Sequence, residues 1–354
     1  MSLQPATREG WRNVPASRGV LSRSTAPAVL AGSLVAGAVV MSIVGFNWYG
    51  VALLAFALNL VGIYTLSRRV EGSRKAKDRL VTAVISSSFV LAVVPLVSLL
   101  VTVVANGWHR LDIELFSSDM RNVLGPGGGI KHALIGTLLI TAVAALMSVP
   151  IGVLTAIYLV EYGRGRLSKL VTFLVDVMTG IPSIVAGLFA VALFSIFLGL
   201  GVRIGFGGSV ALSVLMIPIV VRSTEEMLRL VPHELREASY ALGVPKWRTV
   251  VKVVLPTSVA GIVTGITLAI ARVVGETAPL LVIAGFTQST NTNIFSGRMM
   301  TLPVFVFNSF TQPGSPRSEG IDRAWSAALA LIAVVMLLNL AARLISRYFS
   351  PKTR

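Results

Sequence analysis

Several long stretches of this sequence contain no Asp, Glu, Lys or Arg, and they constrain the fold more than any other feature. A helix that crosses a membrane needs about 20 largely apolar residues. The longest stretch, residues 24–67, has 44 uncharged residues and is interrupted at residues 46–50, so it predicts a helical hairpin. Six further candidate spans cover residues 80–104, 133–160, 168–200, 208–221, 255–271 and 324–342.

The overall composition agrees with eight membrane spans. Hydrophobic residues make up 54% of the chain and charged residues only 13%, against about 25% charged in soluble domains. The absence of cysteine excludes disulfides, cysteine zinc sites and thiol nucleophiles, and three scattered histidines do not suggest a metal site. The chain is therefore predicted to be an integral membrane protein embedded in the lipid bilayer.

The net charge of +16 first suggests nucleic acid as a partner, but the placement of the basic residues argues against it. They lie beside the apolar runs and form no stripe interleaved with aromatic residues. If the N-terminus is inside, the inner segments hold 22 of the 31 Lys and Arg residues and the outer segments hold seven. This excess predicts that both termini are cytoplasmic. The first apolar run could mimic a signal peptide, but it returns at once as a second span, so an uncleaved anchor is favoured.

The two long outer segments, residues 106–131 and 288–323, have the composition of irregular backbone. Within the second, residues 299–310 are apolar but too few to span a membrane. They are either a re-entrant or lid segment or a loop packed on the helices. Residues 180–183, Gly-Ile-Pro-Ser, should kink the fifth span, and Gly261 and Gly265 give a small-residue face for helix packing.

A cytoplasmic segment after the sixth span predicts a short amphipathic helix over residues 232–242. Its apolar face consists of Leu235, Ala238, Ala241 and Leu242. Gly243 should end this helix, and Pro245 should begin another. A short helix under the membrane between two spans can dock into the groove of a partner protein.

This segment carries a resemblance. Glu237 and Ala238, followed by Gly243 and by Leu-Pro at residues 255–256, are similar to the EAA loop of ABC-importer permeases. The resemblance implies that Glu237, Ala238 and Gly243 belong to a coupling helix that enters a cleft of a separate ATPase. A phosphate-binding Walker loop needs a Gly-Lys pair, and this sequence has none. We therefore expect the chain to be no enzyme and to hold no cofactor, with ATP and Mg on the partner ATPase.

Ionisable residues inside apolar spans are costly, so each is a candidate for the substrate pathway. Arg272 and Glu276 are four residues apart and are expected one turn apart on one helix, where the arginine could meet an oxyanion. Arg222 and Asp176 lie within or beside the sixth and fifth spans. The alternatives are a structural ion pair for the first two and an interfacial position for the other two.

Three further motifs look like those of phosphate-specific permeases, of the PstA type rather than the PstC type, at residues 180–188, 221–228 and 271–281. The resemblance covers about residues 80–348. It implies that arginines at the positions of Arg222 and Arg272 take part in phosphate passage, and Glu276 lies in the same motif. The family commonly has six spans, so the N-terminal hairpin is a departure to which we assign no role.

The sequence thus predicts an all-α polytopic bundle with the MetI-like fold of type I ABC importers, in the cell membrane of a prokaryote. Its parts are residues 1–79 with the extra hairpin and a basic loop, a permease domain at 80–348, and a tail at 349–354. The implied partners are a PstC-type permease, two ATPase subunits and an extracytoplasmic phosphate-binding protein. Two alternatives stay open: a permease for sulfate or molybdate and, more remotely, a secondary transporter or channel.

Overall fold

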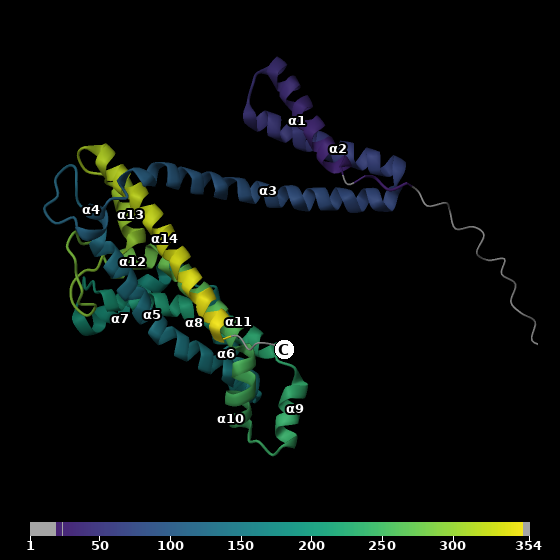
Figure 1. Cartoon of the computed structure of the whole chain (residues 1–354). Helices are drawn as coiled ribbons and strands as arrows, with labels where there is room; N and C mark the ends of the chain where they lie inside the picture. The colour runs from purple at the N-terminus through teal and green to yellow at the C-terminus, as the bar shows by residue number, and fades with distance from the viewer. Residues whose placement is uncertain (1–18, 23, 350–354) are drawn as a thin grey trace, which may run out of the picture. The chain divides into compact units, whose positions relative to one another are not determined.

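The structure, a computed structural model, describes residues 19–22 and 24–349 (Figure 1). Every regular element in these residues is a helix, which confirms the all-α prediction. Seven helices are long and apolar enough to cross a membrane, and a bent pair raises the number to eight. The predicted cytoplasmic N-terminal segment lies largely, and the tail almost entirely, outside the described residues.

The described chain forms two compact units that divide between Leu100 and Val101, within helix α3 (Ser73–Gly107). The first unit holds the predicted hairpin, α1 (Thr25–Val44) and α2 (Trp48–Val70). Asn47 starts α2 by accepting a hydrogen bond from the Tyr49 amide at 2.9 Å, which is an ordinary N-cap. The hairpin is therefore confirmed, with its break where the sequence predicts it.

Glu71 ties the turn after α2 to the start of α3. Its carboxylate accepts hydrogen bonds from Arg79 at 2.6 and 2.8 Å and from Ser67 at 2.8 Å. The hydrogen bond from Arg79 lowers the pKa of Glu71 to about 2, although burial opposes this shift. The carboxylate is therefore charged at neutral pH and holds the basic loop in place.

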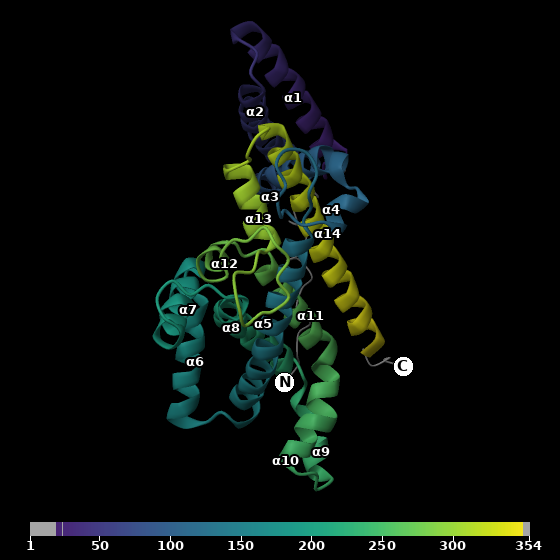
Figure 2. The ribbon, with the colours of Figure 1, turned by 90° about the vertical axis from the view of Figure 1, so that its left-hand side faces the viewer.

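The centre of the second unit is the pair α5 (Lys131–Ile157) and α8 (Gly205–Arg229), which lie side by side (Figures 1 and 2). Ser209 of α8 donates a hydrogen bond to the Ile140 carbonyl of α5 at 3.0 Å. On another face of α8 lies α11 (Leu255–Val274), where Gly261 meets Met227 and Gly265 meets Ser223. The predicted role of the two glycines in packing is confirmed, because small residues let helices approach closely.

The fifth predicted span is broken more sharply than a kink. It consists of α6 (Gly165–Thr179) and α7 (Ser183–Leu198), which meet at 108°. Against α7 lies the short helix α12 (Ala278–Ile283). A Cβ atom on Gly187 of α7 would be 2.6 Å from the Cα atom of Pro279, so only glycine fits there. Two of the motifs that resemble phosphate permeases are thereby in direct contact.

The two segments predicted to be irregular contain short helices. The first holds a 3-10 turn, Trp108–Arg110, and α4 (Ile113–Ser117). The second holds α13 (Leu302–Thr311), which packs against α5 and the long final helix α14 (Arg317–Phe349). The short apolar stretch predicted at residues 299–310 is thus a packed helix, with Leu302, Pro303, Val304 and Phe305 buried.

Candidate pathway and coupling sites

Arg222 of α8 lies between two carboxylates. It donates one hydrogen bond to Glu225 at 2.8 Å and another to Asp176 of α6. Glu225 is only 7% exposed and also accepts from Arg229 at 2.6 Å. The structure therefore joins Arg222 and Asp176, which the sequence singled out separately, and it adds Glu225, which sequence reasoning missed. A glutamate three residues from an arginine in an apolar helix was the available signal.

Arg272 and Glu276 do not share a helix, so the predicted spacing of one helical turn is wrong. The helix α11 ends at Val274 with Gly275 as its C-cap, and Glu276 follows in the connection to α12. Arg272 is exposed in the last turn of α11, and Glu276 is half-buried. Among residues 19–22 and 24–349, neither side chain forms an ion pair. The guanidinium of Arg272 is therefore available to an external anion.

The packing of α8 against α11 fixes the depths of the two arginines. Because Gly261 lies level with Met227 and Gly265 with Ser223, the two helices run antiparallel. Arg272 is two turns beyond Gly265, which places it about 10 Å along the axis from the level of Arg222 at a rise of about 1.5 Å per residue. Arg222 on α8 and Arg272 on α11 therefore lie at two different levels along the axis of the helix pair.

The predicted coupling helix is present as α9 (His233–Ala241). The Gly243 amide donates to the Tyr240 carbonyl at 2.9 Å, and the Val244 amide donates to the Ser239 carbonyl at 3.2 Å. These two bonds form a Schellman cap, in which Gly243 takes the left-handed conformation at φ +73°. The second short helix, α10 (Lys246–Thr249), follows Pro245 as predicted.

One face of α9 is exposed and the other is buried. The exposed side carries the residues that the sequence proposed for coupling, Glu237 and Ala238, together with Leu235 and Leu242. The buried side carries Arg236 and Ser239. The apolar face predicted from the sequence thus has no cover within the described part of this chain.

Arg236 anchors α9 to the end of α5 through a buried ion pair. Its guanidinium donates to Glu161 at 2.8 and 3.0 Å and to the carbonyls of Leu228 at 3.0 Å and Val231 at 2.6 Å. Lys246 also donates to the Glu161 carbonyl. Glu161 belongs to a π-helical segment, Tyr158–Tyr162, and such segments are frequent at functional sites. Sequence reasoning did not identify this pair.

A second π-helical segment, Val250–Val254, joins α10 to α11. Just before it, Thr249 shares a buried hydrogen bond of 2.8 Å with Ser239 of α9. The helix α9 is therefore held on both sides, to the end of α5 by Arg236 and to the start of α11 by Ser239. A displacement of α9 would therefore act on the end of α5 and on the start of α11.

Comparison with known proteins shows the family to which this chain belongs. Residues 148–354 match the family described as binding-protein-dependent transport system inner membrane component. The phosphate transport system permease protein PstA 1 of Mycobacterium tuberculosis H37Rv is 49% identical over 284 residues, which cover 79% of this chain and 91% of that protein. The phosphate transport system permease protein PstA of Yersinia pestis is 37% identical, with 78% and 92% covered.

A solved structure supports the fold alone. A chain of a bacterial alginate ABC transporter, crystallised in complex with a periplasmic protein bound to an alginate pentasaccharide, has a TM-score of 0.55 to this chain. The identity is 15%, and the match covers 78% of this chain and 96% of that one.

Proposed function

Since this chain belongs to the binding-protein-dependent transport system inner membrane components, and within them to the PstA phosphate transport permeases, we propose that it forms one half of an ATP-driven phosphate pathway across a prokaryotic cell membrane. The observation that carries this proposal is the identity of 37 to 49% to PstA permeases over most of the chain. The structure supplies the membrane-spanning helices that such a subunit needs.

The proposed assembly contains this chain, a PstC-type permease, two ATPase subunits and an extracytoplasmic phosphate-binding protein. The sequence has no Gly-Lys pair and hence no Walker loop, so ATP and Mg would be bound by the ATPase and not by this chain. Both termini would be cytoplasmic, as the distribution of Lys and Arg favours. The exposed face of α9 would then lie on the side where an ATPase can reach it.

Coupling would pass from the ATPase through α9 to the pathway helices. When the ATPases close on ATP, the exposed face around Glu237 and Ala238 would move with them. The buried bonds of Arg236 and Ser239 would transmit this displacement to α5 and α11. Energetically, the two states of the permease must bind the ATPase differently for ATP to drive the exchange between them.

The pathway would use charges at two depths. Arg272, which has no carboxylate partner in the described chain, would receive phosphate first, and Glu276 lies just beyond it. Arg222 is held by Asp176 and Glu225, so phosphate would have to compete with two carboxylates there. This competition would keep the inner site weak and allow phosphate to leave.

Two other functions stay as alternatives to be tested. A permease for sulfate or molybdate would need the same fold, but the similarity to PstA argues for phosphate. A secondary transporter or channel would need no ATPase and no coupling helix. Uptake that depends on ATP and on an intact α9 separates that alternative from the proposal.

The cap of α9 gives a direct test of coupling. We expect Gly243→Val to lower phosphate uptake about tenfold, because a β-branched residue at φ +73° costs about 1–2 kcal/mol and should displace the cap. Gly243→Asn is the matched control, since asparagine tolerates this conformation, and it should keep most of the uptake. Uptake and ATP hydrolysis are measured on the same membranes. Equal uptake in the Val variant and the parent would refute the coupling role of this segment.

A further inference from the structure

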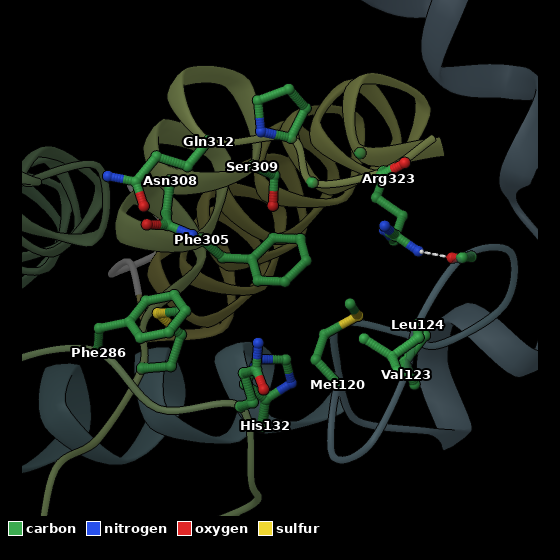
Figure 3. A pocket seen from close by; sticks show the side chains of 17 residues that line it. Met120, Val123, Leu124, His132, Phe286, Phe305, Asn308, Ser309, Gln312 and Arg323 are labelled. Atoms are coloured by element: carbon green, nitrogen blue, oxygen red, sulfur yellow. Dashed lines mark hydrogen bonds between the residues drawn. The ribbon is translucent and has the colours of Figure 1, made fainter. Parts of the chain in front are cut away.

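A pocket of about 210 Å³ lies where the two segments predicted to be outside come together (Figure 3). Its walls come from the loop before α5, the first turn of α5, the segment after α12, helix α13 and the start of α14. The lining includes the apolar side chains of Met120, Phe286 and Phe305 and the polar side chains of Gln288, Asn308, Ser309 and Gln312. None of these residues belongs to the pathway or coupling sites described above.

His132 is the most unusual residue in this pocket. It is 1% exposed, and neither ring nitrogen has a hydrogen-bond partner in the described part of the chain. Its ring packs edge-on against Phe305, with centroids 5.4 Å apart (Figure 3). Buried polar groups in proteins are nearly always hydrogen-bonded, so the two orphaned nitrogens point to a bound partner.

Arg323 is the one charged side chain that lines the pocket, and it is 6% exposed. Its Nη1 atom donates to the carbonyls of Gly125 at 2.9 Å and Gly127 at 3.0 Å. No hydrogen bond is formed by Nε or Nη2, and no carboxylate among residues 19–22 and 24–349 forms an ion pair with it. The pocket therefore holds a positive charge whose remaining donors are free for an anion.

Two acids lie near the charged and polar groups of this pocket, and both already have partners. Glu319, near Arg323, pairs with Arg110 at 3.5 Å. Asp119, near His132, is held by hydrogen bonds. Its carboxylate accepts hydrogen bonds from the Arg121 amide and from the amide and hydroxyl of Thr290, all at 3.1 Å. Burial opposes ionisation, but these bonds outweigh it and lower the pKa of Asp119 below its ordinary value. Asp119 forms no hydrogen bond with His132, so it does not satisfy the imidazole.

We propose that this pocket binds hydrogen phosphate, with Arg323 paired to an anionic oxygen and one ring nitrogen of His132 accepting a hydrogen bond from the P–OH group. The proposal rests on the proposed function and adds a second phosphate site, outside the pathway arginines, to it. A neutral imidazole has one acceptor nitrogen, which can bond only to a donor. Hydrogen phosphate offers a P–OH donor, whereas sulfate and the phosphodiester of a lipid headgroup offer only acceptors at neutral pH. The site should therefore select free phosphate over both.

The test is equilibrium binding of radiolabelled inorganic phosphate to the purified permease and ATPase complex in lipid nanodiscs, without the binding protein. All samples carry Arg272→Gln, so that binding at the proposed pathway site is weakened. We expect saturable binding that a hundredfold excess of sulfate displaces little. His132→Phe should weaken it at least tenfold. Because Arg323 also holds the glycine loop, Ser309→Phe is the second variant, which should fill the pocket without removing either partner.

Ser318→Phe, at an exposed position of α14 outside the pocket, is the matched control and should bind phosphate normally. Unchanged binding in His132→Phe and Ser309→Phe, or equal displacement by sulfate, would overturn the proposal. Uptake is measured in parallel on complexes with the parental Arg272. Phosphate uptake without saturable pocket binding would reject the pocket alone, and pocket binding without ATP-driven uptake would reject the proposed function alone.

Discussion

Replacing Arg272 by Gln is expected to lower ATP-driven phosphate uptake at least ~30-fold while the complex still assembles. Arg272 is exposed in the last turn of α11 and forms no ion pair with any described residue, so its removal strands no buried carboxylate. Phosphate entering the membrane would lose a charged partner, which costs about 2 kcal/mol or more and corresponds to ~30-fold. The effect should therefore fall on transport and spare the fold.

The conservative variant separates charge from geometry. Arg272→Lys keeps the positive charge but lacks the planar fork that grips two oxygens, so we expect uptake between those of the parent and the Gln variant. Arg166→Gln, at an exposed position of α6, is the matched control and should transport normally. Uptake is measured in membranes with equal amounts of permease and ATPase. Parental uptake in Arg272→Gln would leave Arg222 and Asp176 as the remaining pathway candidates.

The largest effect on stability is expected from Glu161→Gln. The side chains of Glu161 and Arg236 are only 5% and 10% exposed, and Glu161 is the only carboxylate paired with Arg236 in the described chain. Breaking a buried pair from one side leaves a buried charge without its counterion and costs about 3–5 kcal/mol. We expect the thermal midpoint of the purified complex to fall by roughly 10 °C.

A double replacement tests whether the charge pair itself is responsible. Glu161→Met with Arg236→Met removes both charges and should destabilise less than Glu161→Gln alone, because no charge is left buried. Glu234→Gln on the exposed side of α9 is the control and should leave the midpoint unchanged. Glu161→Met and Arg236→Met are also measured singly. If the losses in their thermal midpoints add up to the loss in the double variant, the two residues act independently.

The sequence predicted the helices well where the signal is local. The hairpin was evident because residues 46–50 interrupt an uncharged run, and the structure breaks there with an Asn47 cap. The break after α6 was evident from Gly180 and Pro182, but its angle of 108° was not. In the structure α7 packs against α12 through the contact of Gly187 with Pro279, residues 92 positions apart, which no local pattern contains.

The sites were predicted less completely, for two physical reasons. The spacing of Arg272 and Glu276 suggested a shared helix because the surrounding residues are apolar, but Gly275 ends α11 before Glu276. The bond between Arg236 and Glu161 joins positions 75 apart, so only the tertiary structure brings them together. A sequence shows which charges lie in or near spans, and packing decides which of them meet.

The most direct test of the central claim is transport by a reconstituted complex. The chain is placed in liposomes with a PstC-type permease, the ATPase and the phosphate-binding protein, and uptake of labelled phosphate, sulfate and molybdate is followed with and without ATP. The account predicts that phosphate accumulates only when ATP and this chain are both present, and that sulfate and molybdate do not. Preferential uptake of sulfate or molybdate, or phosphate movement through this chain without the ATPase, would contradict it.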